Sequence, residues 1–267
     1  MIKIVQKKAM MNKKKQNLVL NNLGFDSNLK VYQDKDAFNY SVDTILLGNF
    51  IHLTTSIKYA LEIGANNGAL SIFVASRKKD LKIDAVEIQK EPSELAQKNV
   101  ELNNLESQIK IINQDFNDFY KNHQKNTLKK YQSIFVNPPY YQLDKNKTKK
   151  IEKSKLIATH EVSINLEQII KGSRGIIEQK GYLNFVIPIE RLVDLFYLLR
   201  KYNFEPKRVQ LVYPRIYEKA KFALVESRFN SGWGVHFLKN LYLHPEDKND
   251  HSYLEEIKKK YKPKIFE

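Results

Sequence analysis

The chain has 267 residues, 42% of them hydrophobic, which is enough for the core of one large α/β domain with a small appendage. It has no cysteine, which excludes disulfides, thiolate catalysis and zinc–thiolate sites, and no apolar run approaches the roughly 18 residues of a membrane helix. Its 45 Lys and Arg against 30 Asp and Glu give a net charge of +15, which favours an anionic partner, nucleic acid first.

Two details of the composition bear on the partner and the compartment. Only seven of the 45 cationic residues are Arg, so codon usage can explain part of the lysine content, although it does not explain the shortage of acids. Residues 1–8 lack the apolar stretch of a secretory signal. We therefore expect a soluble cytoplasmic protein with no membrane contact.

The first 35 residues predict a basic extension ahead of the main domain. Residues 1–16 are rich in lysine, and the alternating sequence LKVYQ suggests that residues 17–34 form a hairpin. A short helix is expected over residues 40–50. We assign residues 36–267 to a single domain.

From residue 58 onward, strand-like apolar runs alternate with helix-like runs. Strands are expected at 58–64, 82–88, 109–113, 133–137 and 181–187. Helices are expected at 69–79, 92–104, 166–179 and 188–202. Two last strands, 208–214 and 221–229, follow each other without a helix and should pair antiparallel. The pattern predicts a doubly wound α/β sheet with ligands at the carboxyl ends of its strands.

A glycine-containing turn links the first strand of this pattern to its helix. Gly64 and Gly68 let the backbone approach a ligand closely, and the start of the helix offers unpaired amides. Asn66 stands where many such loops have a third glycine, and Asn tolerates the left-handed conformation. The turn predicts a ligand contact that includes Asn67, although a plain strand-to-helix connection has the same features.

Two acidic residues narrow the choice of ligand. Glu87 ends the next strand, 19 residues after Gly68, where a carboxylate accepts hydrogen bonds from ribose hydroxyls; Ile88 beside it should line the same site. Glu62 lies at the start of the turn, where a carboxylate suits the amino group of a methionine moiety better than a pyrophosphate. These features favour S-adenosylmethionine over NAD as the cofactor.

Asp115 and Phe116 follow the third strand of the pattern. The carboxylate can accept a hydrogen bond from an adenine amino group, and the phenyl ring can line the base. A helix N-cap at Asp115 is an equally good and compatible interpretation.

The fourth strand ends in a stiff polar corner, Asn137-Pro138-Pro139-Tyr140. Prolines cannot continue a central strand, so the corner should lie at the carboxyl edge beside the glycine turn. There it should face the reactive end of the cofactor, and Asn137 is expected to contact the cofactor as well. It suits methylation of a planar amino nitrogen, whose lone pair is delocalised into a ring. The Asn137 amide oxygen and the Pro138 carbonyl can accept the two N–H bonds, and Tyr140 can stack on the base. A rigid turn without a catalytic role is the alternative.

The order of these features along the chain resembles that of the motifs in class I S-adenosylmethionine-dependent amino-methyltransferases. The features are Glu62 and Gly64, then Glu87, then Asp115, and last the corner Asn137-Pro138-Pro139-Tyr140. Residues 38–50 resemble the cofactor-capping helix of the bacterial tRNA1(Val) adenine-37 N(6)-methyltransferase family, and residues 188–215 and 221–228 resemble its C-terminal half. The resemblance implies a Rossmann-like seven-stranded sheet with an antiparallel C-terminal strand pair. It also implies methyl transfer to the N(6) amino group of adenine 37 in the anticodon loop of tRNA1(Val), with Tyr40 and Asp43 near the methionine end of the cofactor.

An anticodon loop presents single-stranded bases, and lysines should supply the phosphate contacts. Residues 144–155 are expected to order on RNA, although a solvated surface loop fits their composition equally well. The candidate RNA contacts are Lys145, Lys147, Lys149, Lys150, Lys153, Lys155, Arg191 and Arg215. The lysine-rich N-terminus and the segment EEIKKKYKPK (255–264) are weaker candidates, and His160 is expected to be structural.

Two other functions are compatible with the same motifs. One is methylation of a glutamine amide in a release factor, but only about 60 residues precede the glycine turn, and they do not resemble the helical substrate domain of those enzymes. The other is an RNA-binding module with an inactive methyltransferase fold, which a test of cofactor binding would distinguish. The expected partner is the anticodon arm of a tRNA, and no metal site or obligate protein partner is expected.

Overall fold

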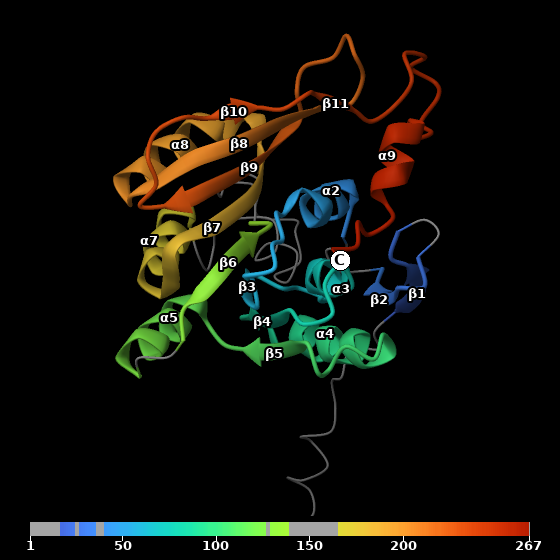
Figure 1. The fold of residues 1–267 in the computed structure, drawn as a ribbon. Coiled ribbons are helices and arrows are strands. Elements are labelled where there is room, and N and C mark those ends of the chain that lie inside the picture. The colour runs from blue at the N-terminus through green and yellow to red at the C-terminus, as the bar shows by residue number, and fades with distance from the viewer. Residues whose placement is uncertain (1–16, 25–26, 36–39, 127–128, 139–164, 267) are drawn as a thin grey trace, which may run out of the picture.

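The structure is a computed structural model of the full chain, and it describes residues 17–24, 27–35, 40–126, 129–138 and 165–266 (Figure 1). Several predicted functional residues lie outside these ranges: Pro139, Tyr140, the six lysines of residues 145–155, and His160. The described residues form a small antiparallel sheet near the N-terminus and one large mixed sheet.

The large sheet has the strand order β10-β8-β9-β7-β6-β3-β4-β5, and β11 pairs with β8. Its strands are β3 (Tyr59–Ile63), β4 (Lys82–Glu87), β5 (Ile109–Asn113), β6 (Tyr131–Val136), β7 (Ile177–Pro188), β8 (Phe204–Tyr213), β9 (Phe222–Phe229), β10 (His236–Phe237) and β11 (Leu241–Tyr242). Strands β3 to β7 run parallel, whereas β9 is antiparallel to both β7 and β8. The α/β sheet with an antiparallel C-terminal pair is thus confirmed. The two-residue strands β10 and β11 were not expected, because they are too short to show an alternating pattern.

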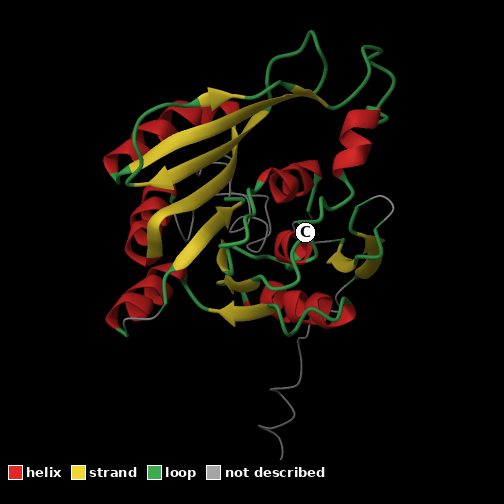
Figure 2. Cartoon of the chain, viewed as in Figure 1, coloured by secondary structure: helices red, strands yellow, loops and turns green. Residues whose placement is uncertain are grey.

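Helices cover both faces of this sheet (Figures 1 and 2). One face carries α2 (Val42–Phe50), α3 (Ala69–Ala75) and α4 (Lys90–Leu102), and the other carries α5 (Phe116–Lys125), α7 (Leu166–Ile176) and α8 (Leu192–Lys201). Along β6, Phe135 packs into the first core, while Ile134 and Val136 pack into the second. Burial on both faces explains why these strands are nearly continuous apolar runs.

The expected hairpin is present as β1 (Leu18–Asn22) and β2 (Lys30–Asp34). Asn99 of α4 pairs with the backbone of β2: its Oδ1 accepts from Tyr32 N at 2.7 Å, and its Nδ2 donates to Tyr32 O at 3.0 Å. Asn103 makes the same pair of bonds with Lys30, at 3.0 and 2.7 Å. The hairpin is therefore attached to the main domain through two asparagines of one helix, and the domain boundary at residue 35 stays a prediction.

Three helices are shorter than their sequence patterns predicted. The helix expected over 188–202 is α8, Leu192–Lys201, because β7 extends to Pro188 and residues 189–191 form a 3-10 turn. The helix expected over 69–79 ends at Ala75, since Arg77 and Lys78 turn inward and donate to carbonyls after α2, at 2.9 Å to Ile51 O and 2.7 Å to Ile57 O. The helix expected over 166–179 ends at Ile176. There the chain begins to pair with β6 as β7, so tertiary pairing overrides local helical periodicity.

None of the helices in the described part of the chain combines the length and the apolar character needed to cross a membrane.

Helix α2 packs closely on α3 through Gly48. A Cβ built on Gly48 would lie 2.6 Å from Cδ1 of Phe73, which is fully buried and cannot move aside. We expect Gly48→Val to lower the free energy of unfolding by about 1 to 3 kcal/mol in urea denaturation, because overpacking strains the core. The matched control is Gly232→Val, where nothing lies within 4 Å of an added Cβ. Equal losses in the two variants would show that the α2–α3 contact is not this tight.

Candidate functional site

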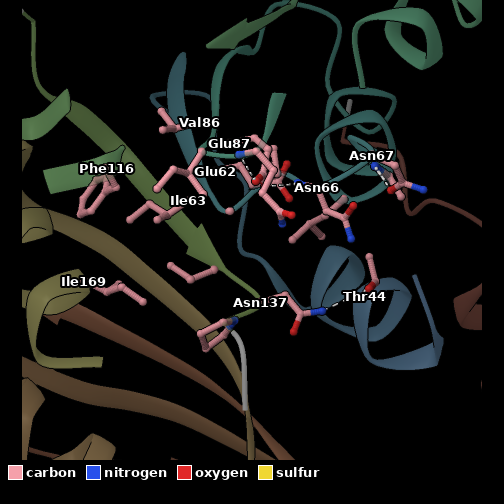
Figure 3. A pocket seen from close by; sticks show the side chains of 18 of the residues that line it. Thr44, Glu62, Ile63, Asn66, Asn67, Val86, Glu87, Phe116, Asn137 and Ile169 are labelled. Atoms are coloured by element: carbon pink, nitrogen blue, oxygen red, sulfur yellow. Dashed lines mark hydrogen bonds between the residues drawn. The ribbon is translucent and has the colours of Figure 1, made fainter. Parts of the chain in front are cut away.

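A pocket opens at the edge of the large sheet where β3, β4 and β6 end, and where the chain leaves β5 (Figure 3). It spans about 960 Å³, counting the solvent at its mouth. Nine of the eleven residues predicted to bind a cofactor line it, and Pro138 lines it too; Asp43 and Gly68 are outside the lining. The lining residues are Tyr40, Thr44, Glu62, Ile63, Gly64, Ala65, Asn66, Asn67, Ala69, Leu70, Val86, Glu87, Ile88, Gln89, Gln114, Asp115, Phe116, Val136, Asn137, Pro138 and Ile169.

The turn after β3 brings backbone to the floor of the pocket. Gly64 has φ 76°, and a Cβ built on it meets nothing within 4 Å, so a side chain here would point into open space. The amides of Gly64 and Ala65 both donate to Val86 O, at 2.9 and 3.0 Å, which fixes the turn to β4. Asn66 has φ 48°, so it adopts the left-handed conformation that a residue in place of the third glycine must adopt.

The end of the turn packs against α4 at the point where α3 begins. Gly68 caps α3 with φ 80°, and a Cβ there would lie 3.3 Å from the Cβ of Ala96, so this glycine serves the packing of the turn and does not line the pocket. Asn67 lines the pocket and is buried; its Oδ1 accepts from Ala69 N at 3.4 Å. Its Nδ2 is buried and has no hydrogen-bond acceptor among the described residues, so a bound ligand could supply one.

Glu87 ends β4 with its carboxylate in the pocket. Oε2 accepts from Asn66 N at 2.9 Å and Oε1 from Gln89 N at 2.8 Å, so the group is oriented by backbone amides. Each oxygen can accept a further bond, as a pair of ribose hydroxyls would require. Burial raises the pKa of Glu87, and the backbone amide bonds oppose this shift.

Glu62 is almost fully buried at the end of β3, where it accepts a hydrogen bond from the Ser71 hydroxyl of α3. Burial raises its pKa to about 8; the bond from Ser71 opposes the shift, and the nearby charge of Glu87 adds to it. A cation that entered the pocket beside Glu62 would favour the ionised carboxylate.

Asp115 and Phe116 both line the pocket at the start of α5. The alternative interpretation also holds, because Asp115 is the N-cap and its Oδ1 accepts from Asn117 N at 2.6 Å. Its second oxygen, Oδ2, can accept from a ligand, since a carboxylate offers several acceptor positions. Phe116 and Ile169 of α7 form the apolar wall at one end of the pocket (Figure 3).

Asn137 follows β6 and lies between the sheet and α2 (Figure 3). Its Nδ2 donates to Thr44 Oγ1 at 3.2 Å and to Asp43 Oδ2 at 3.4 Å. Asp43 itself is buried at the start of α2, where its Oδ1 accepts from Thr44 N at 2.8 Å and from the Ser41 hydroxyl. Asp43 thus contacts the amide of the corner, and it does not line the pocket as the sequence had suggested.

Some lining residues were not predicted. Gln89 and Gln114 each lie just after a strand end, so the rule that ligands bind there could have found them. Thr44 lies in α2, where the family resemblance pointed to Asp43 and not to its neighbour Thr44. Ile169 comes from α7, and no sequence pattern connects this helix with the pocket.

The two predicted RNA contacts within the described ranges differ in environment. The Arg191 side chain is 17% exposed and pairs with Asp194 at 3.2 Å. Arg215 is buried; it donates to the carbonyls of Asp247, Lys248 and Asp250, so its guanidinium braces a turn of the chain. Its Nη1 donates to Glu218 at 3.2 Å, so these contacts occupy the guanidinium and Arg215 is not a candidate for RNA binding.

The family model of the methyltransferase small domain matches residues 42–191, which are more than half of the chain. The chain belongs to this family. The matched range includes the glycine turn, Glu87, Asp115 and Asn137.

Curated relatives from several organisms carry the name tRNA1(Val) (adenine(37)-N6)-methyltransferase. The one from Dyadobacter fermentans is 31% identical over 160 residues, which are 60% of this chain and 62% of the relative. The one from Aliivibrio salmonicida is 28% identical over 164 residues, 61% of this chain and 66% of the relative. The chain therefore spans less than two thirds of the length of each of these two relatives.

Among solved structures, a predicted O-methyltransferase from Agrobacterium tumefaciens has a TM-score of 0.65 and 19% sequence identity. The likeness covers 84% of this chain and 98% of that one. At this identity the similarity concerns the fold, and it confirms the class I methyltransferase sheet.

The burial of Glu62 makes stability depend on pH. The folded protein keeps a proton on Glu62 up to about pH 8, whereas the unfolded chain releases it near pH 4.5. The stability that this group contributes is full below about pH 4.5 and is lost as the pH rises toward 8. Because glutamine does not titrate, Glu62→Gln should gain stability relative to the unmodified protein across this window, measured by urea unfolding. A difference that stays constant with pH would refute the raised pKa.

Proposed function

We propose that this chain transfers a methyl group from S-adenosylmethionine to the N(6) amino group of an adenine in tRNA. The observation that carries the proposal is the position of Asn137, which follows β6 at the pocket with its amide nitrogen bound by α2. The names of the two curated relatives support adenine 37 of tRNA1(Val), in the anticodon loop, as the target. A tRNA substrate would place the working protein in the cytoplasm.

The residues of the pocket fit S-adenosylmethionine, which supplies an electrophilic methyl group when bound. Gly64 leaves open space where a side chain would block a ligand, and the Glu87 carboxylate is oriented to bind ribose hydroxyls. Asp115 can accept from the adenine amino group while Phe116 lines the ring. We assign Glu62 to the cationic methionine end, where the ligand charge would offset the burial of the carboxylate.

Asn137 would act on the substrate amine through its oxygen. A carboxylate carries no proton, so the contact with Asp43 Oδ2 requires the NH2 end of the amide, and this orients Oδ1 away from α2. The oxygen and the Pro138 carbonyl can then accept the two N–H bonds of the adenine amino group. Both acceptors lie on a short rigid segment, so their alignment costs little reorganisation.

Acceptance of these two bonds draws the nitrogen toward tetrahedral geometry and directs its lone pair at the methyl group. No general base is required, since the nitrogen becomes acidic once it has gained the methyl group, and its proton then passes to solvent. Asp43 and Thr44 do not touch the reacting atoms in this account; they are positioning residues for the Asn137 amide.

Cations outside the pocket would bind the RNA backbone. We keep Lys145, Lys147, Lys149, Lys150, Lys153, Lys155 and Arg191 as candidate phosphate contacts. The lysine segment, residues 144–155, follows the corner closely in the sequence and lies outside the described residues.

Substitution of Asn137 should separate catalysis from cofactor binding. Asn137→Ala should lower kcat about 100- to 1000-fold, the usual cost of removing one transition-state acceptor or donor. Calorimetry should show an S-adenosylmethionine Kd close to that of the unmodified protein, because the amide serves the acceptor nitrogen. Loss of cofactor affinity together with activity would contradict the assigned role.

The positioning role of Thr44 predicts a graded result. Thr44→Val removes one of the two acceptors of the Asn137 amide, leaving Asp43, at nearly constant shape, and should lower kcat about fivefold, the value of one hydrogen bond of about 1 kcal/mol. Thr44→Ser keeps the hydroxyl and should retain activity. The KM values for cofactor and tRNA should change little in both variants. Equal loss in the serine and valine variants would assign the effect to packing instead.

The function itself is tested by incubation of the full chain with labelled S-adenosylmethionine and total tRNA, followed by nucleoside mass spectrometry. N(6)-methyladenosine that maps to position 37 of tRNA1(Val) is the expected product. Cofactor binding without any methylated nucleoside would contradict the proposal and favour a non-catalytic RNA-binding module. Tight cofactor binding with methylation of a different base would refute the assigned target.

A further inference from the structure

The hairpin of β1 and β2 precedes residues 42–191, which match the family model, so the family match assigns it no role. The hairpin nevertheless contacts residues that line the pocket. Tyr40 lines the pocket and donates from its hydroxyl to Asn22 O of β1 at 2.8 Å. Val31 of β2 is fully buried in the same apolar core as Ala69, which also lines the pocket. The hairpin is thus attached to the wall of the site.

The turn of the hairpin is fixed by packing as well. Leu23 is fully buried, and its amide donates to Leu29 O at 2.8 Å. Next to it, Tyr261 O, which follows α9 (Glu255–Lys260), leaves no room for a Cβ on Gly24. The hairpin is therefore a firm support for any element that it contacts.

One side of α4 contacts both the hairpin and the glycine turn. Ala96, Asn99 and Asn103 are three and four residues apart, so they lie on the same side of the helix. Ala96 packs against the turn, 3.3 Å from a Cβ built on Gly68. Asn103 bonds the backbone of Lys30 in β2. Asn99 lies between these two contacts and is fully buried.

The Asn99 amide connects two backbones. Its Oδ1 accepts from Tyr32 N at 2.7 Å, and its Nδ2 donates to Tyr32 O at 3.0 Å and to Asn67 O at 2.9 Å. Both N–H bonds of the amide are used in this way, so Asn99 has no donor left for a ligand. It links β2 of the hairpin with a residue of the turn that lines the pocket.

Asn67 carries a buried donor that favours a different conformation of the turn. The residue is 4% exposed, and its Nδ2 has no acceptor within the described part of the chain. A buried unpaired donor is unfavourable, so a turn that was free to relax would expose this amide to water. The bond from Asn99 to the Asn67 carbonyl opposes that relaxation. Figure 3 shows Asn67 at the end of the pocket away from Phe116 and Ile169.

We propose that Asn99 is a positioning residue for the cofactor, which holds the turn at Asn67 against the hairpin in the conformation that binds the ligand. The inference rests on the proposed function, since it takes S-adenosylmethionine as the ligand. A ligand that meets a preorganised turn does not have to order it, and this increases affinity. By linkage, the ligand and the attached hairpin must stabilise each other to the same extent. The hairpin is then part of the cofactor site through Asn99.

The test compares Asn99→Ala with the matched control Asn103→Ala in the full chain. Asn103 also attaches the hairpin, through both backbone atoms of Lys30, but its third bond goes to Asn99 O at 2.7 Å, within α4. Asn99→Asp is a second variant of the same size, for use if the alanine variant does not fold. Its carboxylate keeps the acceptor for Tyr32 N, but once ionised it cannot donate to Asn67 O.

Binding of S-adenosylhomocysteine is measured by calorimetry, and hydrogen exchange is followed at the amides of residues 64–68 and of β2, with and without this ligand. We expect Asn99→Ala to raise the Kd about five- to tenfold, the scale of one lost hydrogen bond, and to speed exchange at 64–68. The KM for S-adenosylmethionine should rise much more than kcat falls, because Asn137 is oriented by α2.

The ligand should slow exchange in β2 of the unmodified protein, and this protection should be lost in Asn99→Ala. Asn103→Ala should speed exchange in β2 even without ligand. Its Kd should stay close to that of the unmodified protein, since the bonds of Asn99 remain.

An unchanged Kd in Asn99→Ala, or in Asn99→Asp if only that variant folds, would overturn the inference. An equal rise of the Kd in the Asn99 and Asn103 variants would also overturn it, because attachment of the hairpin in general would then be the cause. If the unmodified protein binds no S-adenosylhomocysteine, the proposed function fails, and exchange at residues 64–68 without ligand still decides whether Asn99 holds the turn. Faster exchange there in the Asn99 variant alone supports this role, and equal exchange in all proteins refutes it. A Kd that depends on Asn99 in a protein that methylates no tRNA would refute only the proposed function.

Discussion

The Asn137 amide joins two elements that the rest of the site depends on. Its nitrogen donates to Thr44 and Asp43 of α2, while its backbone continues β6, a central strand with neighbours on both sides. The strand fixes where the amide lies, and the helix fixes which of its two ends faces the pocket. A change at either element would therefore alter the acceptor oxygen without any direct contact with a substrate.

Helix α2 is in turn fixed from several directions. Gly48 lets it approach Phe73 of α3, and Asn49 binds the backbone of Lys262 and Lys264. Arg208 of β8 donates to Phe50 O at 2.9 Å at its end. The helix that orients the amide is thus held at several points, as preorganisation of an acceptor requires.

Much of the fold could be read from the sequence because parallel strands buried on two faces leave unmistakable apolar runs, such as residues 133–136. The positions of Gly64, Glu87 and Asp115 followed from one rule, that ligands bind where parallel strands end. The left-handed Asn66 was expected from its place in the turn and is observed, with φ 48°.

The remaining features depend on contacts between distant segments. Asp43 was assigned to the cofactor by resemblance, but its contact with Asn137 joins residues 94 positions apart. Helix α3 ends early because the Arg77 side chain donates to the carbonyls of Ile51, after α2, and of Lys264, near the C-terminus. Local helix propensity does not predict these distant contacts. Ile169 enters the pocket only because α7 packs beside α5, which is a property of the whole layer.

The most direct measurement is a crystal structure of the full chain with S-adenosylhomocysteine and an anticodon stem-loop. The account predicts adenine N6 within hydrogen-bond distance of both Asn137 Oδ1 and the Pro138 carbonyl, with Nδ2 still on Thr44 and Asp43. An amide turned so that Nδ2 faces the adenine, or an adenine bound away from this corner, would contradict it.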